Sequence, residues 1–174
     1  FIRGQHAMSV GASREAYECI GEAINLMTAV YGVMHPDMPQ CLRALARLSH
    51  VLGETADALN HQHKATVMSE RLLGLDSGNT IVEYINLAHF AFGALLIPGS
   101  LRPLYRARYL MNLVFGEKHP VMAQIDANIG TILFTIQEFD TALKYLQSAD
   151  AISKSIGEPR KLKTGLISNL IART

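Results

Sequence analysis

The side chains of this sequence best suited to chemistry are arginines, a histidine and amides that recur at helical spacing. Arg43 and Arg47 are four residues apart, so on a helix their guanidinium groups share one surface. Gln40 and His50 are predicted to face the same side of that helix. Guanidinium groups arranged in this way bind carboxylates or phosphates, which predicts a site for an anionic ligand.

Two later segments are predicted to extend this surface into a groove. Asn86 and Asn128 are 42 residues apart, and an amide side chain can donate and accept hydrogen bonds at once. The predicted members are Asn86, His89 and Phe92 in one segment, and Gln124, Asn128, Thr131 and Phe134 in the next. The alternative interpretation is that the arginines are solvated and the phenylalanines belong to the core.

Sequence patterns for catalysis are absent: there is no Gly-x-Ser-x-Gly, no P-loop and no His-Glu-x-x-His. His61 and His63 are two residues apart and point to different sides of a helix, which predicts a solvated helix surface rather than a metal site. His35 and His119 precede prolines, where capping or packing of a turn is expected. We therefore expect no enzyme, no cofactor and no metal.

The elements that must position these residues recur with a period of about 42 residues. Gly32, Gly74, Gly116 and Gly157 are separated by 42, 42 and 41 residues. Gly116 is predicted to end a helix in the left-handed conformation, and Pro120 suits the first turn of the next helix. Small residues follow the same period, which predicts helices that approach closely: Ala16, Ala58, Ser100 and Ala142; Ala23, Ala65, Ala107 and Ala149; Ala46, Ala88 and Gly130.

Each period is predicted to form a helix, a short turn and a second helix. The expected helices cover residues 1–10, 13–31, 37–52, 55–73, 79–94, 99–115, 120–136 and 139–156, with 160–173 beginning a fifth pair. Pro98 and Pro103 predict that the helix at 99–115 starts late or bends, and Ile97-Pro98-Gly99-Ser100 breaks the repeat pattern. The fold class is all-α, with one domain over 1–174 belonging to a longer protein.

Composition and charge exclude several classes of protein. Sixteen basic and fifteen acidic side chains nearly cancel, so a strong overall attraction to nucleic acid or to an anionic membrane is not indicated. No apolar run reaches about 18 residues, so membrane insertion is not expected. The last predicted helix would expose apolar side chains that can pair with another chain: Leu166, Ile167, Leu170 and Ile171.

The columns of small residues match the tetratricopeptide repeat, and the longer period resembles that of kinesin light chains. A closer resemblance is to the clustered mitochondria protein family (also called Clueless), in its C-terminal repeat region. It is carried by Leu45-Ala46-Arg47-Leu48, Met68-Ser69-Glu70-Arg71, Leu104-Tyr105-Arg106-Ala107-Arg108-Tyr109-Leu110-Met111 and Val114-Phe115-Gly116-Glu117. The resemblance implies a tetratricopeptide superhelix in a large cytosolic protein. It also implies association with messenger RNAs for mitochondrial proteins and a role in the distribution of mitochondria.

A second basic set consists of Arg102, Arg106 and Arg108, and no acidic residue lies between 98 and 116. The same resemblance suggests a function for these arginines. Contact with phosphates is one hypothesis for these arginines, and a solvated face or bridges to a neighbouring helix is the other. The predicted groove suits single-stranded RNA, or an extended protein segment with an acidic or C-terminal carboxylate group. We therefore expect either a messenger-RNA-binding module or a peptide-binding adaptor of kinesin-light-chain type.

Overall fold

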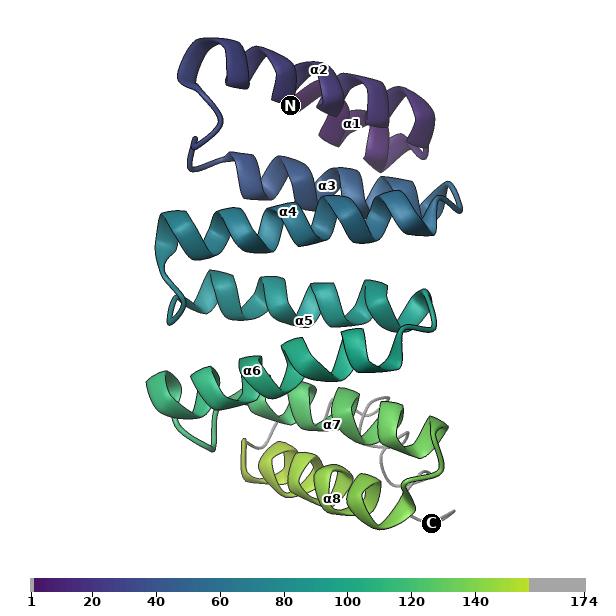
Figure 1. Cartoon of the computed structure of the whole chain (residues 1–174), viewed down its shortest axis with the longest axis vertical. Helices are drawn as coiled ribbons and strands as arrows, with labels where there is room; N and C mark the ends of the chain where they lie inside the picture. The colour runs from purple at the N-terminus through teal and green to yellow at the C-terminus, as the bar shows by residue number, and fades with distance from the viewer. Residues whose placement is uncertain (1, 157–174) are drawn as a thin grey trace. The chain divides into compact units, whose positions relative to one another are not determined.

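Eight α-helices follow one another in the computed structural model, which describes residues 2–156 of the 174-residue chain. Within Phe1–Leu96 and within Ile97–Thr174, successive described helices run antiparallel and are joined by short turns (Figure 1). No strand occurs within this described range. The helices are α1 Ile2–Val10, α2 Ser13–Tyr31, α3 Met38–Val51, α4 Thr55–Leu73, α5 Gly78–Gly93, α6 Ile97–Phe115, α7 Pro120–Thr135 and α8 Phe139–Ile156.

The all-α prediction is confirmed, and the helix ends fall within two residues of those expected from the 42-residue period. The 42-residue period predicts the helices correctly because the apolar face of each helix recurs in every repeat. The local sequence pattern therefore indicates which helices pack together. The predicted helix at 160–173, with Leu166, Ile167, Leu170 and Ile171, lies outside the described residues.

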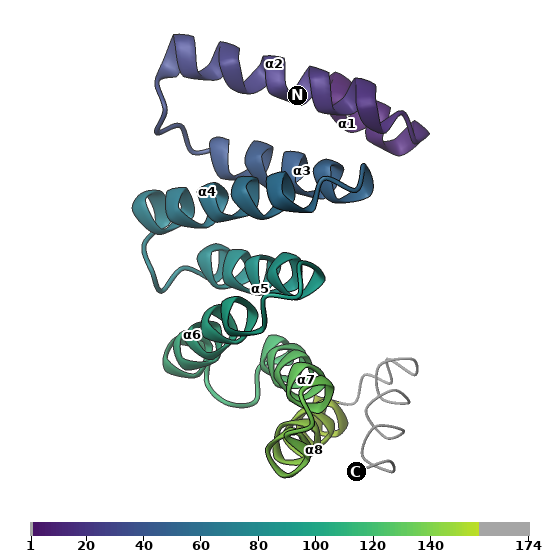
Figure 2. The ribbon, with the colours of Figure 1, turned by 45° about the vertical axis from the view of Figure 1, so that its right-hand side comes forward.

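The helices form two compact units, Phe1–Leu96 and Ile97–Thr174. In the first, each of the helices α1, α2, α3 and α4 packs on the next one along the chain. In the second, α6 packs on α7 and α7 on α8. The pair α3 and α4 lies side by side in two views, which shows the antiparallel arrangement inside a repeat (Figures 1 and 2).

The columns of small residues mark close helix crossings inside both units. Gly130 has no room for a side chain, because an added Cβ would lie 2.7 Å from Cγ of Leu146. Gly4 meets Ile20 in the same way, and these two contacts are three repeats apart in sequence. Gly4 therefore belongs to the column of Ala46, Ala88 and Gly130, although the sequence analysis did not include it. The other columns are buried too, at Ala16, Ala58, Ser100, Ala142, Ala65, Ala107 and Ala149, whereas Ala23 is half-buried.

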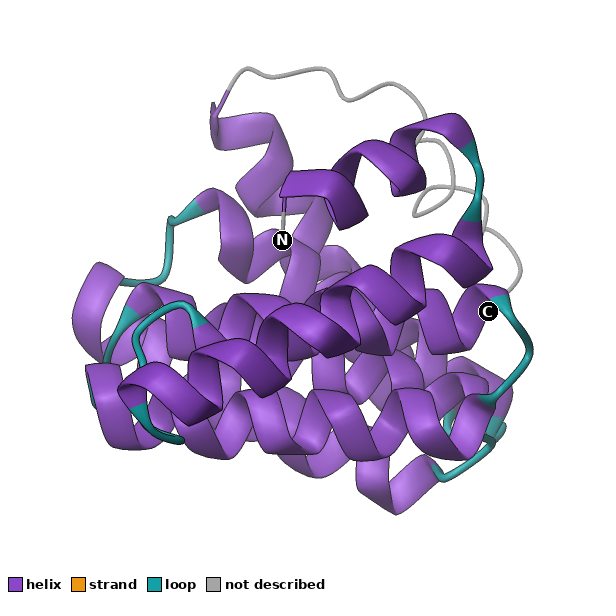
Figure 3. Ribbon diagram, turned by 90° about the horizontal axis from the view of Figure 1, so that it is seen from above, coloured by secondary structure: helices purple, strands orange, loops and turns teal. Residues whose placement is uncertain are grey.

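The turns inside the pairs repeat one backbone geometry. At the α3–α4 turn, Gly53 N donates to His50 O over 3.1 Å and Glu54 N donates to Ser49 O over 2.8 Å. The α5–α6 turn has the matching bonds from Leu95 N to Phe92 O and from Leu96 N to Ala91 O, both at 2.9 Å. These are the bonds of a Schellman motif, in which the residue after the helix has a positive φ. The loops lie at the helix ends (Figure 3).

The prediction that the repeat is broken at Ile97–Ser100 is wrong for the backbone of this turn. Leu95 has φ 60° and Gln137 has φ 67°, at the positions where the first two repeats have Gly11 and Gly53. Of the two alternatives predicted for α6, a late start or a bend, the late start is wrong, since the helix begins at Ile97. Pro98 is the second residue of α6, where a missing N–H leaves no helical bond unmade.

The turns between pairs differ from the predicted left-handed cap in one respect. Gly32 has φ 82° and ψ 177°, and Gly74 has φ 89° and ψ 165°. Their φ is positive as expected, but the ψ values belong to an extended region that is open essentially to glycine alone. Gly116 shares the positive φ at 82°. The glycine period therefore reflects a conformation that no other residue adopts without strain.

Of the capping or packing predicted for the histidines before proline, His119 shows both and His35 shows the packing. Nδ1 of His119 accepts a hydrogen bond from Val121 N over 3.2 Å at the start of α7. Its ring packs on Phe115, with ring centroids 5.2 Å apart. The same ring pair recurs two repeats earlier between Tyr31 and His35, at 4.9 Å. In both turns, an aromatic residue at the end of one helix packs on the histidine that precedes the next helix.

The α4–α5 turn, which has no His-Pro, is closed by hydroxyl groups instead. Thr80 Oγ1 donates to Gly74 O over 2.8 Å and lies 2.9 Å from Ser69 Oγ. Both hydroxyl-bearing side chains are buried, so these bonds satisfy groups that water cannot reach.

Candidate functional site

Five of the predicted groove residues surround one cavity of about 460 Å³ in the unit Phe1–Leu96. They come from α3 and α5, the first helices of two successive pairs. The cavity is lined by Arg43, Arg47, His50, Val51, Asn86, His89 and Phe90. Gln40 and Phe92 do not line it, while Val51 and Phe90 do so without having been predicted.

Arg43 is tied to the core as well as to the cavity. Its Nη1 donates to Glu83 Oε1 over 2.9 Å, and the Glu83 side chain is only 3% exposed. Gln62 Nε2 donates to the other carboxylate oxygen over 2.7 Å. This network joins α3, α4 and α5, and it satisfies a buried charge that would otherwise be costly.

Arg47 differs from Arg43 because it is exposed and makes no hydrogen bond or ion pair with another residue of the described part of the chain. It lies one helical turn after Arg43, so its guanidinium group belongs to the same side of α3. Its five N–H groups therefore remain available to an anionic ligand.

Imidazole and phenyl rings form the other side of the cavity. The ring of His50 lies 6.4 Å from that of His89 and 5.5 Å from that of Phe90, in edge-to-face arrangements. Phe90 is buried and supports the two exposed imidazoles. Gly93 leaves space beside them, since an added Cβ would lie 3.6 Å from Cε1 of His50. These rings offer hydrogen bonds and flat surfaces to a ligand.

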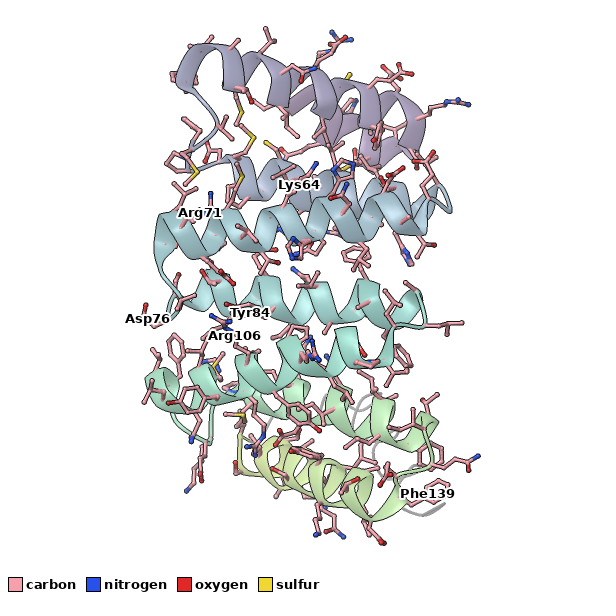
Figure 4. The ribbon with its side chains drawn as sticks, in the orientation of Figure 1. Lys64, Arg71, Asp76, Tyr84, Arg106 and Phe139 are labelled. Carbon is pink, nitrogen blue, oxygen red and sulfur yellow. The ribbon has the colours of Figure 1, made fainter. Side chains whose placement is uncertain are left out.

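The remaining predicted groove residues lie on α7 in the second unit. Gln124 and Thr131 are exposed, and Asn128 and Phe134 are half-buried. Thr131 Oγ1 donates to Ala127 O of its own helix over 2.8 Å. The Phe134 ring lies edge-on to Phe139, at 5.4 Å, where α8 begins (Figure 4).

The three arginines of α6 divide into two kinds. Arg102 and Arg106 are exposed. Arg108 is half-buried, and its Nε donates to Oδ1 of the fully buried Asp126 over 2.6 Å, which raises the pKa of Arg108. Ser148 Oγ donates to the other oxygen of Asp126 over 2.7 Å, and the Arg108 guanidinium lies 5.5 Å from the centroid of the Tyr145 ring. Arg108 therefore joins α6, α7 and α8.

The expectation of a solvated helix surface is wrong for His61 and right for His63. Gln62 is fully buried, and His61 is half-buried with its Nε2 3.4 Å from the Tyr17 hydroxyl. Burial lowers the pKa of His61, and nearby Lys64 lowers it further. His63 is exposed. Among the described residues, no three His, Cys, Asp or Glu side chains are grouped so as to hold a metal ion.

The helices of residues 2–156 include none with both the length and the apolar content needed to cross a bilayer.

The fold places the chain among helical-repeat proteins of the tetratricopeptide type. The crystal structure of BtubC (BKLC) from P. vanneervenii has a TM-score of 0.82 at 17% identity, covering 97% of this chain and 70% of that one. The tetratricopeptide-like repeats of a putative kinesin light chain from Podosopora anserina have a TM-score of 0.81 at 14% identity, covering 98% and 81%. These identities are low, so the likeness establishes the fold alone.

Sequence relatives define the family. Over all 174 residues the chain is 91% identical to the clustered mitochondria protein homolog of Caenorhabditis elegans, and over 173 residues it is 46% identical to that of Homo sapiens. It covers 14% and 13% of these two proteins, so it corresponds to about one seventh of their length. The chain belongs to the clustered mitochondria protein family. No family model matches it.

Proposed function

We propose that this chain is a non-catalytic binding module of a cytosolic clustered mitochondria protein, which handles messenger RNAs for mitochondrial proteins and acts in the distribution of mitochondria. Membership of the family supports the role of the whole protein, of which the chain is a small part. Within the chain, we assign RNA contact to the cavity between α3 and α5.

The observation that carries this proposal is the exposed guanidinium of Arg47 beside the imidazoles of His50 and His89. A guanidinium group binds a phosphate through paired hydrogen bonds, and imidazole rings stack on bases. Asn86 lies in the same cavity, and its amide can donate to and accept from a base edge. The cavity therefore combines the three contacts that single-stranded RNA requires.

The test compares a fluorescently labelled segment of a transcript for a mitochondrial protein with heparin as an unrelated acidic polymer. We expect the transcript to bind better than heparin, with affinity that falls as salt increases. Arg47→Ala is expected to weaken binding and reduce the salt slope by about one. Equal binding of both polymers would contradict RNA recognition by this segment.

Arg71 provides the matched control, because it is an exposed arginine on α4 and does not line the cavity (Figure 4). Arg71→Ala removes the same charge and is expected to leave RNA binding nearly unchanged. Arg43→Ala is a poorer test than Arg47→Ala, since it also removes the partner of a buried carboxylate.

A peptide-binding adaptor is the second candidate, and the half-buried amide of Asn86 in the cavity favours it. The Asn86 side chain makes no hydrogen bond with other residues in the described range, so it can pair with the backbone of an extended segment. This candidate predicts that Asn86→Ala, alone and with Asn128→Ala, weakens binding of a protein partner while RNA binding is absent. Unchanged partner binding in both variants would exclude it.

A further inference from the structure

An aromatic and apolar stripe runs along the outer surface of α6. Tyr105, Tyr109 and Leu113 are spaced four residues apart, which places them on one side of the helix. Their exposed fractions are 41%, 68% and 67%. Val114 and Phe115 are also exposed, but they lie on other sides of the helix. Apolar side chains grouped in this way on a soluble domain mark a surface that binds something.

Cationic side chains lie at the other end of this stripe. Arg102 and Arg106 fall on the same side of the helix as Tyr109 and are exposed. We define the α6 face by its five residues: Arg102, Tyr105, Arg106, Tyr109 and Leu113. One end of the face is therefore basic and the other end is apolar.

The charge of α6 sets it apart from the three other second helices of the repeats. It contains three arginines and no Lys, Asp or Glu. Each of the others carries acids: Glu15, Glu18 and Glu22 in α2; Asp57 and Glu70 in α4; Asp140 and Asp150 in α8. Tyr and Arg are enriched in protein interfaces, whereas Lys, Asp and Glu are depleted there. The composition of α6 is that of an interface.

The base of the α6 face is held in place by α8. The Tyr105 ring lies 6.2 Å from the ring of Tyr145, and Tyr145 in turn lies 5.5 Å from the Arg108 guanidinium. Arg108 is fixed by the buried Asp126, so an ion pair supports the two tyrosine rings. A surface whose side chains are already ordered loses less entropy when it binds.

We propose that the α6 face docks an acidic protein segment. A carboxylate of the partner meets Arg102, and an apolar side chain of the partner packs on Tyr109 and Leu113. A second copy of the chain is a poor occupant, because two α6 helices would bring like charges together. RNA fits the apolar end poorly, since Tyr109 and Leu113 offer phosphates no cation. This surface and this partner are distinct from the cavity assigned to RNA.

The test selects peptides from a random display library on the immobilised 174-residue chain and resynthesises them for affinity measurements. We expect selected peptides rich in Asp or Glu and carrying a Leu or Phe. Tyr109→Ala and Arg102→Ala should each weaken them by about tenfold, as truncation of an interface anchor does. Replacing the acids of the peptide by amides should weaken it comparably.

Control variants separate this surface from others. Tyr31→Ala removes a similarly exposed tyrosine on α2 and should leave the peptides bound. Arg47→Ala alters the cavity and should also leave them bound, so failure of the RNA assignment would not affect this result. Circular dichroism checks that the α6 variants keep their helical content, which is expected because both side chains are exposed.

Three outcomes would overturn the proposal. One is a set of peptides without acidic enrichment, or with affinity unchanged by Tyr109→Ala and Arg102→Ala. Another is binding of oligouridine to the chain that is lost in these two variants. That result would make the α6 face a nucleic-acid site. The third is binding to phosphatidylserine vesicles that depends on the same residues, which would make it a membrane-surface site.

Discussion

The Arg43 guanidinium donates to the Glu83 carboxylate over 2.9 Å, and so the first arginine of the cavity is bonded to a buried residue. Arg43 comes from α3 and Glu83 from α5, with Gln62 of α4 bonded to the same carboxylate. The network crosses three helices and two repeats. It therefore links the shape of the cavity to the stacking of the repeats that form it.

Removing the positive partner of this network should destabilise the first unit. Arg43→Ala leaves Glu83 buried with only Gln62 as a partner, and we expect a loss of about 2 kcal/mol, below the full range for a buried pair because Arg43 is partly exposed. Urea unfolding followed by circular dichroism measures it. Arg47→Ala should change stability by less than about 0.5 kcal/mol, since it removes an exposed side chain.

The coupling between Arg43 and Glu83 can be measured separately from the cost of each truncation. In a double-mutant cycle with Arg43→Ala and Glu83→Ala, we expect a coupling of about 1–2 kcal/mol. Additive effects of the two substitutions would contradict a direct stabilising pair.

The close crossing at Gly130 gives a second stability prediction. Gly130→Ala places a Cβ 2.7 Å from Cγ of the buried Leu146, and we expect a loss of about 1–2 kcal/mol after the gain in helix propensity is included. Gly21→Ala is the matched control on α2, where nothing lies within 4 Å of the added Cβ. It should stabilise the chain by about 0.5–1 kcal/mol. Equal effects at the two positions, measured by thermal unfolding, would contradict a special role for Gly130.

The repeat register could be predicted from sequence because it depends on local periodicity. Ala46, Ala88 and Gly130 recur every 42 residues, and their burial follows from that spacing. Helix boundaries and five of the seven cavity residues came from the same register. Their role in binding stays a prediction. Phe90 lines the cavity in place of Phe92 because a shift of two residues turns a side chain by more than half a helical turn.

The buried polar groups could not be predicted, because their burial depends on partners far away in sequence. Glu83 and Asp126 resemble ordinary surface acids of a helix, and nothing in their spacing indicates burial. Glu83 is paired with Arg43, 40 residues earlier, and Asp126 with Arg108, 18 residues earlier. Neither distance is a multiple of the repeat. Arg43 and Arg108 are consequently partly structural. For Arg108 this is the bridge to a neighbouring helix that was the alternative to phosphate contact.

Two turn positions should accept glycine with a gain in stability. Leu95 and Gln137 have positive φ where earlier repeats have Gly53 and Gly11, and a side chain in this region costs about 1 kcal/mol. Leu95 is 81% exposed, so its removal loses little burial. After the entropy of glycine in the unfolded chain is included, Leu95→Gly and Gln137→Gly should each gain about 0.5 kcal/mol. Gly53→Ala should instead lose about 1 kcal/mol, and a gain there would contradict the strain argument.

Burial of His61 predicts a dependence of stability on pH. Its pKa is lowered in the folded state, first by burial and then by Lys64, so the unfolded chain binds the proton more tightly. The unfolded value is about 6.5, and stability from this group is complete above it and is lost as pH falls below it toward the folded pKa. His61→Gln should therefore flatten the fall of Tm on acidification. His63→Gln, on the exposed side of α4, should keep the slope of the unaltered chain.

Because His61→Gln can also alter packing against Tyr17, the test depends on the slope of Tm with pH and not on the absolute Tm. Identical slopes for all three chains would show that His61 does not carry the effect.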